Sequence, residues 1–357
     1  MRFKRSIFSN FLQNAPFGFA TLNHFPRKRG QNRKREIKMN KQFNLTKFLI
    51  EQRSIIALLV LIAVVSFLNP NFFSTDNLLN ILRQTSVNAI IAIGMTFVIL
   101  IAGIDLSVGS VLALTGAVAA TLIGMDMSIY LVVPLVLIFG GLIGTLNGAL
   151  VAFGKVQAFM ATLITMLLLR GVTMIYMGGR PISTGFSDNA DAFAEIGTGV
   201  LFGIPVPVWL MFILFALGWF LLTQTRIGRY IYALGGNESA TALSGINVNK
   251  VKLFVFAVSG VLAALAGLIV TSRLGSAQPT AGTGYELDAI AAVVVGGTSL
   301  MGGKGRIIGT LIGALIIGFL SNALNLLDID SYYQLVAKAL VILAAVVLDN
   351  FIGRKKA

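Results

Sequence analysis

The few residues of this sequence that could do chemistry are single polar side chains set in long apolar stretches. Asp105 stands in Gly103-Ile104-Asp105-Leu106-Ser107-Val108-Gly109-Ser110, at a glycine-flanked break between two such stretches. A charge inside a membrane is costly, so it is a functional-site hypothesis by default. The structural alternative is a helix cap, in which the Asp105 carboxylate accepts from free amides of the following helix. Three neutral residues could line an aqueous path with Asp105 or simply bond across helices: Asn147, Gln157 and Thr165.

Four more charged residues fall in or beside apolar stretches. Arg170 and Lys338 lie within such stretches, and Glu286 and Asp288 precede a short apolar segment, 289–300. Proton-coupled carriers use chains of intramembrane carboxylates and histidines, and the sequence has no ladder of that kind. The sparse charges therefore argue against an ion-coupled carrier.

Several kinds of chemistry lack their residues. There is no cysteine, and the one histidine, His24, stands in a basic N-terminal stretch, so thiolate sites, Ser-His-Asp relays and histidine metal sites have no material in the apolar body. A carboxylate-only catalytic site remains formally possible. Gly303-Lys304 is not a phosphate-binding loop, because Thr298 holds the place of the upstream glycine and Gly305 that of Ser/Thr. We expect no metal, no cofactor and no enzyme activity, with any ATP hydrolysis on a partner.

The composition is that of a membrane protein. Hydrophobic residues make up 56% of the 357 residues, charged residues 12%, and the mean hydropathy is +0.85, whereas soluble domains have about 25% charged residues. A spanning helix needs roughly 20 mostly apolar residues. The sequence therefore predicts an all-α, polytopic helical bundle. The predicted spans are 50–68, 87–103, 106–124, 129–153, 156–177, 207–222, 253–271, 307–327 and 333–352, with 289–300 as a tenth span or a re-entrant segment.

The distribution of Lys and Arg predicts the orientation, because basic loops stay in the cytoplasm. The segment 223–252 is basic, the segment 178–206 is acidic, and the C-terminus ends in Arg354-Lys355-Lys356. With a cytoplasmic N-terminus and about ten spans, every basic segment lies inside and the acidic one outside. Nine spans would misplace one basic group, so we expect ten, with both termini cytoplasmic.

The first 38 residues differ from the rest, with ten Lys/Arg against one acid, Glu36. Runs such as Arg27-Lys28-Arg29 could bind anionic lipid or nucleic acid, or form a disordered cytoplasmic tail. We favour a third interpretation, in which translation begins at Met39. The predicted organisation is thus a basic extension over 1–38 and a transmembrane domain over 39–357, with membrane lipid and no nucleic acid as partners.

Glycines at four-residue spacing predict close helix packing. Gly140, Gly144 and Gly148 form two overlapping GxxxG steps, and Gly309 and Gly313 form another. This spacing puts the glycines on one helix face, where two backbones approach closely in lipid. The sequence leaves open whether they pack helices within one subunit or between two.

The cytoplasmic segment 223–252 has the strongest local signals. Gly235-Gly236-Asn237 predicts a turn, in which Gly235 would matter if the turn needs a positive φ. A short helix over Glu238–Leu243, capped by Asn237 and stopped by Gly245, should follow. Such a helix suits docking into a partner's groove, although a plain surface linker is the alternative. The candidate docking residues are Arg229, Gly235, Gly236, Asn237, Glu238, Ala240 and Gly245.

The run GRYIYALGGNESATALSGINVNK resembles the coupling segment of sugar-type ABC permeases, the ribose transport permeases most closely. The resemblance extends to GIDLSVGS at 103–110, VVVGGTSLMGGKGRIIGTLIGAL at 293–315 and SYYQLVAKALVIL at 331–343, and covers 39–350. The general coupling signature EAA-x-x-x-G is met only loosely, because four residues separate Glu238-Ser239-Ala240 from Gly245.

The resemblance implies an inner-membrane transport subunit. Two permease subunits would form the translocation pathway as a homodimer, two ATP-binding-cassette ATPase subunits would dock on the cytoplasmic side, and a periplasmic sugar-binding protein would deliver the substrate, D-ribose. The segment 235–246 would transmit the ATPase motion. The alternatives are a permease for another monosaccharide or autoinducer-2, an ion-coupled secondary carrier, and a membrane-embedded enzyme.

Overall fold

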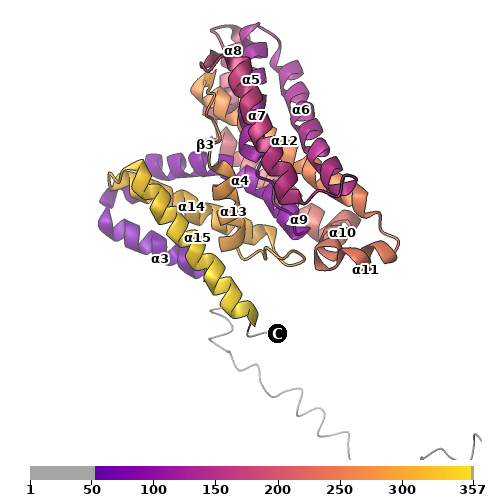
Figure 1. The fold of residues 1–357 in the computed structure, drawn as a ribbon. Helices are drawn as coiled ribbons and strands as arrows, with labels where there is room; N and C mark the ends of the chain where they lie inside the picture. Colours follow the sequence, from indigo (N-terminus) through magenta and orange to yellow (C-terminus); the bar gives the residue numbers. More distant parts are fainter. Residues whose placement is uncertain (1–52, 355–357) are drawn as a thin grey trace, which may run out of the picture. The chain divides into compact units, whose positions relative to one another are not determined.

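The computed structural model describes residues 53–354 (Figure 1). Contacts divide the chain into a unit over 1–51 and a unit over 52–357, and only the second is described here. The predicted basic extension over 1–38 lies outside the described residues. The helices are α3 (Arg53–Leu68), η1 (Pro70–Phe73), α4 (Thr75–Leu100), α5 (Val108–Gly124), α6 (Ile129–Ala152), α7 (Ala158–Met177), α8 (Asp188–Thr198), α9 (Val206–Gln224), α10 (Arg226–Gly236), α11 (Glu238–Leu243), α12 (Val248–Leu274), α13 (Tyr285–Val295), α14 (Ile307–Leu326) and α15 (Ser331–Arg354).

The described residues are mainly helical, with two small strand pairs. Strand β1 (Ile182–Ser183) pairs antiparallel with β4 (Ser276–Ala277), and β2 (Val200–Leu201) with β3 (Ile204–Pro205). Within 53–354, six helices are long and apolar enough to cross a membrane, namely α4, α6, α7, α9, α12 and α14. Helices α3 and α5 contain shorter apolar stretches.

Most predicted spans match a helix to within a few residues, but one boundary is wrong. The span predicted to begin at residue 87 belongs to α4, which begins at Thr75 with the Ser74 hydroxyl accepting from the Asn77 amide. Its first three turns carry many polar residues, so a span predicted from hydropathy leaves these turns out. The segment predicted over 289–300 is α13, which begins earlier and has 11 residues.

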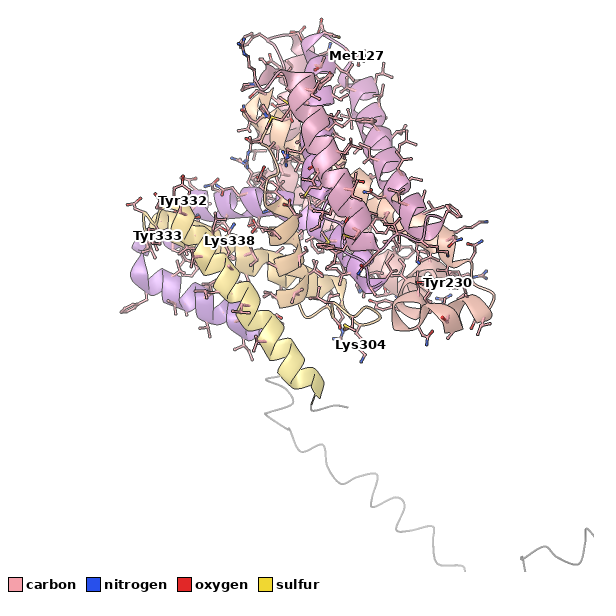
Figure 2. All side chains as sticks on the ribbon, viewed as in Figure 1. Met127, Tyr230, Lys304, Tyr332, Tyr333 and Lys338 are labelled. Carbon is pink, nitrogen blue, oxygen red and sulfur yellow. The ribbon has the colours of Figure 1, made fainter. Side chains whose placement is uncertain are left out.

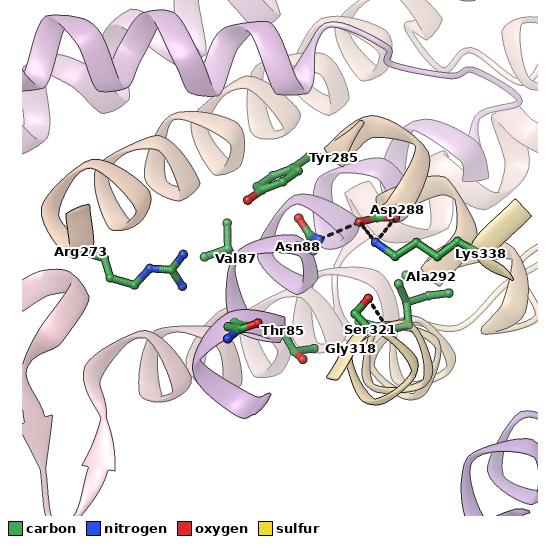
Figure 3. Close-up of a pocket in the computed structure, with 13 residues that line it drawn as sticks. Thr85, Val87, Asn88, Arg273, Tyr285, Asp288, Ala292, Gly318, Ser321 and Lys338 are labelled. Atoms are coloured by element: carbon green, nitrogen blue, oxygen red, sulfur yellow. Dashed lines mark hydrogen bonds and ion pairs between the residues drawn. The ribbon is translucent and has the colours of Figure 1, made fainter. Parts of the chain in front are cut away.

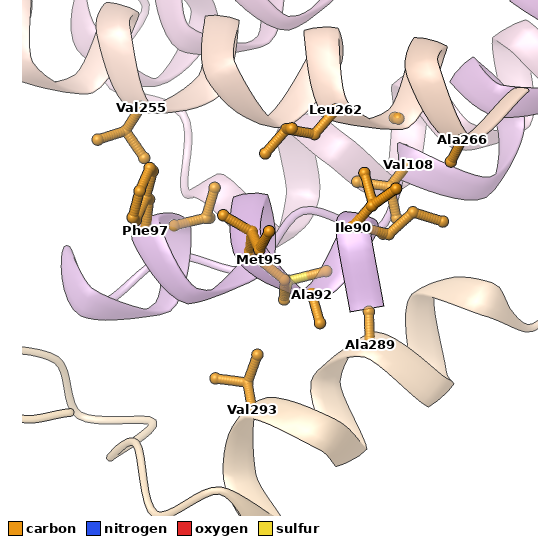
Figure 4. Packing of buried hydrophobic residues seen from close by; sticks show 14 of the residues in the cluster. Ile90, Ala92, Met95, Phe97, Val108, Val255, Leu262, Ala266, Ala289 and Val293 are labelled. Carbon is orange, nitrogen blue, oxygen red and sulfur yellow. The ribbon is translucent and has the colours of Figure 1, made fainter. Parts of the chain in front are cut away.

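Helix α4 forms the centre of the described bundle. Its C-terminal half is buried almost without interruption, because α12 packs on one side of it and α13 on the other (Figure 4). In that close-up Met95 and Ile90 lie between Leu262 of α12 and Ala289 of α13. In contrast, α6 and α7 leave many large apolar side chains exposed, which suits helices that face lipid.

Glycines bring α6 against α12. A Cβ atom on Gly144 would collide with the Phe256 carbonyl oxygen, and one on Gly260 would collide with the Gly140 carbonyl oxygen. Gly148 lies 3.0 Å, measured from an ideal Cβ, from the Cα of Leu253. The first glycine series thus packs two helices of the same chain. Gly309 and Gly313 likewise face α13, against the carbonyls of Gly296 and Ala292.

Loops gather at two ends of the described unit. The coupling end consists of residues 100–103, 225–247 and 296–306, joined by a bond from the Gly303 amide to the Leu100 carbonyl (2.9 Å). The opposite end consists of 125–128, 178–205 and 275–277, joined by the β1–β4 pair and by the Asn189 amide on Asp126 (2.8 Å). Figure 2 shows Met127 at the opposite end and Lys304 at the coupling end.

Candidate coupling and polar sites

Asp105 lies buried between α4 and α5, 1% exposed. One carboxylate oxygen accepts from the Ser107 amide (3.0 Å) and the Ser107 hydroxyl (2.6 Å), and the other accepts from the Ser259 hydroxyl of α12 (2.8 Å). Helix α5 begins at Val108 with Ser107 as its N-cap residue. Asp105 therefore closes a local turn just before the helix instead of capping the helix's own amides.

The network around Asp105 continues into α6 and α7. The Asn147 amide donates to the Ser107 hydroxyl (2.9 Å), and the Thr165 hydroxyl donates to the Asn147 oxygen (2.6 Å). The structure thus brings Asp105, Asn147 and Thr165 together in one chain of hydrogen bonds. Gln157 is not part of it, because it is exposed at the start of α7 and makes no side-chain capping bond.

Arg170 of α7 holds a non-helical, partly buried segment. Its guanidinium donates to the carbonyls of Pro279 (3.1 Å) and Ala281 (2.9 Å), which lie between β4 and α13. A Cβ on the neighbouring Gly282 would meet the Cα of Gly109 at 3.1 Å. Residues 278–284 therefore pass beside the first turn of α5, with Pro279 and Gly282 buried and Thr280 and Thr283 exposed.

The short helix of the coupling segment has the bounds that its sequence predicts. Helix α11 runs over Glu238–Leu243, the Asn237 side chain accepts from the Ala240 amide (2.9 Å), and Gly245 has a φ of +81°. The turn expectation for Gly235 is wrong. Helix α10 continues to Gly236 and the φ of Gly235 is not positive, so Gly235 must have another reason to be small.

Position 235 needs a glycine because three backbone segments meet there at the coupling end. A Cβ on Gly235 would collide with the Leu100 carbonyl oxygen at the end of α4 and would lie 2.5 Å from the Gly303 amide. The Tyr232 hydroxyl adds a bond to the Gly305 carbonyl (2.9 Å), and burial raises the pKa of Tyr232. Helix α10 thus touches both α4 and the loop that leads into α14.

An ion pair holds α11 on α12. The Lys252 ammonium lies 2.7 Å from the Glu238 carboxylate, with side chains 11% and 52% exposed. No local sequence pattern predicts this pair, because 14 positions separate the two residues. Most other positions of α11 are exposed, and Leu243 is 90% exposed. Arg229 and Ala240 are exposed as well, so the segment presents a surface that is free for contact.

Within residues 53–354 no group of three or more His, Asp or Glu side chains is placed to hold a metal ion. The polar sites of the described residues are hydrogen-bond networks and ion pairs. Sites of this kind hold helices in place or bind polar ligands.

Comparison with known proteins gives a consistent result. Residues 77–346 match the family described as "Branched-chain amino acid transport system / permease component". The "Ribose import permease protein RbsC" of Haemophilus influenzae is 74% identical over 314 residues, which are 88% of this chain and 97% of that protein. Its namesake in Escherichia coli K12 is 65% identical over 303 residues, 85% of this chain and 94% of that protein.

A relative with another name is more distant. The "D-allose transport system permease protein AlsC" of Escherichia coli K12 is 43% identical over 324 residues, 90% of this chain and 98% of that protein. No solved structure matches the chain. The chain belongs to this family of transport permease components, and it is a multi-pass transport subunit of the inner membrane, not an enzyme.

Proposed function

We propose that this chain is the permease subunit of an ABC importer that carries D-ribose into the cytoplasm. The observation that carries the proposal is the identity of 74% and 65% to two ribose import permeases over most of both chains. Permeases named for allose and xylose reach only 43% and 37%. Ribose is therefore favoured over other monosaccharides and over autoinducer-2.

We further propose ten membrane crossings with both termini in the cytoplasm. From Leu100 onward the chain alternates between the two ends, because α5, α6, α7, α9, α12 and α13 each carry it across. Adding α3, α4, α14 and α15 gives ten. The basic segment 223–252 belongs to the coupling end and the acidic segment 178–206 to the opposite end, which supports a cytoplasmic coupling end.

An ABC import permease works with an ATPase and a periplasmic binding protein, and we propose where they dock. The ATPase would contact α10 and α11, whose exposed residues include Arg229, Ala240 and Leu243. The binding protein would contact the opposite end, including α8. A second copy of the permease would complete the pathway. ATPase motion would move α10, and the Gly235 junction would pass that motion to α4 and α14 as a shift between two packed states.

The sequence suggested two roles for Asp105, Asn147 and Thr165, and we favour bonding across helices. Their buried polar atoms have partners within the protein, so a passing sugar would have to replace bonds already made. Gln157 is exposed near the coupling end and remains a proposed path residue on the cytoplasmic side.

The proposal is tested by purifying the permease with its ATPase and reconstituting both in proteoliposomes. We expect ribose-loaded binding protein to stimulate ATP hydrolysis and ribose uptake. ATP-dependent uptake of another sugar with ribose inert would keep the transporter class and reject the substrate. Uptake driven by an ion gradient without an ATPase would instead indicate a secondary carrier.

A further inference from the structure

A polar cavity of about 200 Å³ lies between α4, α13, α14 and α15, outside the Asp105 network (Figure 3). The chain segments that line it include the first half of α4 and the last turn of α12. Its polar lining residues are Gln84, Thr85, Asn88, Arg273, Tyr285, Asp288, Ser321 and Lys338. The cavity is larger than the ~30 Å³ that one water molecule occupies in the liquid, so it has room for several waters or a small polyol.

An ion pair forms one wall of this cavity. The Lys338 ammonium of α15 lies 3.0 Å from the Asp288 carboxylate of α13, with side chains 19% and 15% exposed. The Asn88 amide of α4 donates to the same carboxylate (3.3 Å). Charged groups taken out of water are costly unless they are paired or used. Helices α4, α13 and α15 thus contact one another here through polar atoms, although apolar side chains would pack at this depth without the cost of removing charges from water.

Two oxygens of the lining residues lack partners. The Oγ1 of Thr85 and the Oδ1 of Asn88 are buried and make no hydrogen bond, and Thr85 is only 4% exposed. Buried polar atoms are normally bonded, and each exception needs an explanation. The Thr85 hydroxyl lies against Gly318, which also lines the cavity. A ligand in the cavity would supply the partners that the protein does not.

The backbone beside the cavity is interrupted in a way that suits a ligand site. Helix α13 begins at Tyr285 and has 11 residues, about 16 Å of helix, which is short for a ~30 Å hydrocarbon layer. The non-helical, partly buried residues 278–284 precede it and are held by Arg170. Irregular backbone at membrane depth is tolerated only where protein buries it or where it lines an aqueous cavity.

We propose that this cavity is a subsite for a small neutral polyol on the sugar's path through the permease. Asp288 and Asn88 supply acceptors, Lys338 and Arg273 supply donors, and Tyr285 supplies a ring and a hydroxyl, which together match a molecule whose every carbon carries a donor and an acceptor. Two cations against one carboxylate make the lining unsuited to a metal cation. The inference rests on the proposed function, since it takes the carried sugar as the ligand.

The test compares single and double neutralisation of the ion pair in the full transporter. Asp288→Asn and Lys338→Met each leave one charge unpaired, whereas the double variant removes both and keeps similar shapes. A purely structural pair predicts that the double variant regains the stability and the uptake that the singles lose. A sugar subsite predicts that it regains thermal stability only, with ribose uptake at least roughly threefold to tenfold below wild type, the loss expected for one or more ligand hydrogen bonds.

ATP hydrolysis distinguishes the site from a defect in assembly. We expect the double variant to keep hydrolysis stimulated by ribose-loaded binding protein, so that ATP spent per ribose rises. Parallel loss of hydrolysis and uptake, or normal uptake, overturns the proposal. A wild-type transporter that moves no ribose refutes the proposed function and this inference with it, whereas normal wild-type uptake with a fully active double variant refutes the inference alone.

A second variant tests the subsite without changing the Asp288–Lys338 ion pair. Thr85→Val removes the unpartnered hydroxyl without changing side-chain shape, so a structural role predicts equal or higher stability and normal uptake. The subsite predicts reduced uptake at full stability. Thr173→Val is the matched control, because Thr173 is equally buried and its hydroxyl bonds only the Leu169 carbonyl of its own helix (2.7 Å). Equal uptake by the two variants contradicts a role for Thr85 in the subsite.

Discussion

Glu238 accepts from the Lys252 ammonium at 2.7 Å, and the pair ties the short helix α11 to the start of α12. Glu238→Lys would put two ammonium groups side by side, one of them largely buried. We expect α11 to loosen, at a cost on the order of 1 kcal/mol because Glu238 is half exposed, and ATPase co-purification and ribose uptake to fall.

The exchanged pair, Glu238→Lys with Lys252→Glu, separates two roles of Glu238. If the carboxylate only holds α11 in place, the exchange should restore most of the co-purification and uptake. If the ATPase binds the Glu238 carboxylate directly, the exchange should not restore them. Measuring both variants in one reconstituted system therefore decides between an internal bond and a partner contact.

Gly235 and Gly236 are adjacent, but we expect an alanine to be harmful at Gly235 and harmless at Gly236. A methyl group on Gly235 would collide with the Leu100 carbonyl, whereas one on Gly236 has no neighbour within 4 Å. Gly235→Ala should displace α10 from the end of α4, cost about 1–3 kcal/mol as overpacking does, and reduce coupled uptake in proteoliposomes. Gly236→Ala should leave uptake unchanged. Equal uptake by the two variants would show that the junction does not transmit motion.

The sequence predicts single residues well where the signal is local. Asn237 and Gly245 bound α11 as expected, because a cap and a positive φ depend on adjacent residues alone. The partners of Lys252 and Lys338 lie far away in the chain, and no local pattern reveals them. For the same reason Asp288 could be flagged as a costly charge but not assigned to a cavity.

At the level of helices, the polar start of α4 shows what hydropathy misses. Residues 75–88 look like a loop by composition, yet they form about four turns of helix that pack in the bundle and supply Gln84, Thr85 and Asn88 to the polar cavity. Burial against other helices makes a polar helix face stable, and that partner surface is not readable from the segment itself. The apolar helices lack this difficulty, so most of their predicted boundaries are correct to a few residues.

The α6–α12 contact gives a prediction about a whole helix pair. Gly144→Ala would push the Phe256 carbonyl and the Cα of Gly260, which is 3.1 Å from the ideal Cβ position. We expect the helices to separate, with a loss of about 1–3 kcal/mol seen as a lower thermal midpoint of the purified permease. Gly171→Ala on the exposed face of α7 is the control, because nothing lies within 4 Å of it. A midpoint as high as that of the control would contradict tight packing at Gly144.

For the whole molecule, the orientation and the number of crossings can be tested together. The chain has no cysteine, so single cysteines can be labelled without background. Phe186 and Leu243 are almost fully exposed and Met301 is 83% exposed, which makes them suitable sites at the opposite end, on α11 and in the loop before α14. One proposed crossing, α9, separates the first two along the chain, and two proposed crossings, α12 and α13, separate the last two.

Ten crossings with a cytoplasmic coupling end predict one labelling pattern. A membrane-impermeant maleimide should label Phe186→Cys in intact cells, and Leu243→Cys and Met301→Cys only after the membrane is opened. Labelling of Leu243→Cys in intact cells would reverse the orientation. Labelling of Met301→Cys together with Phe186→Cys would mean that α13 re-enters without crossing, which would conflict with the bond from the Gly303 amide to Leu100 at the coupling end. Short α13 is thus the element on which the count of ten depends, since its 11 residues cross only with the help of the non-helical segment before it.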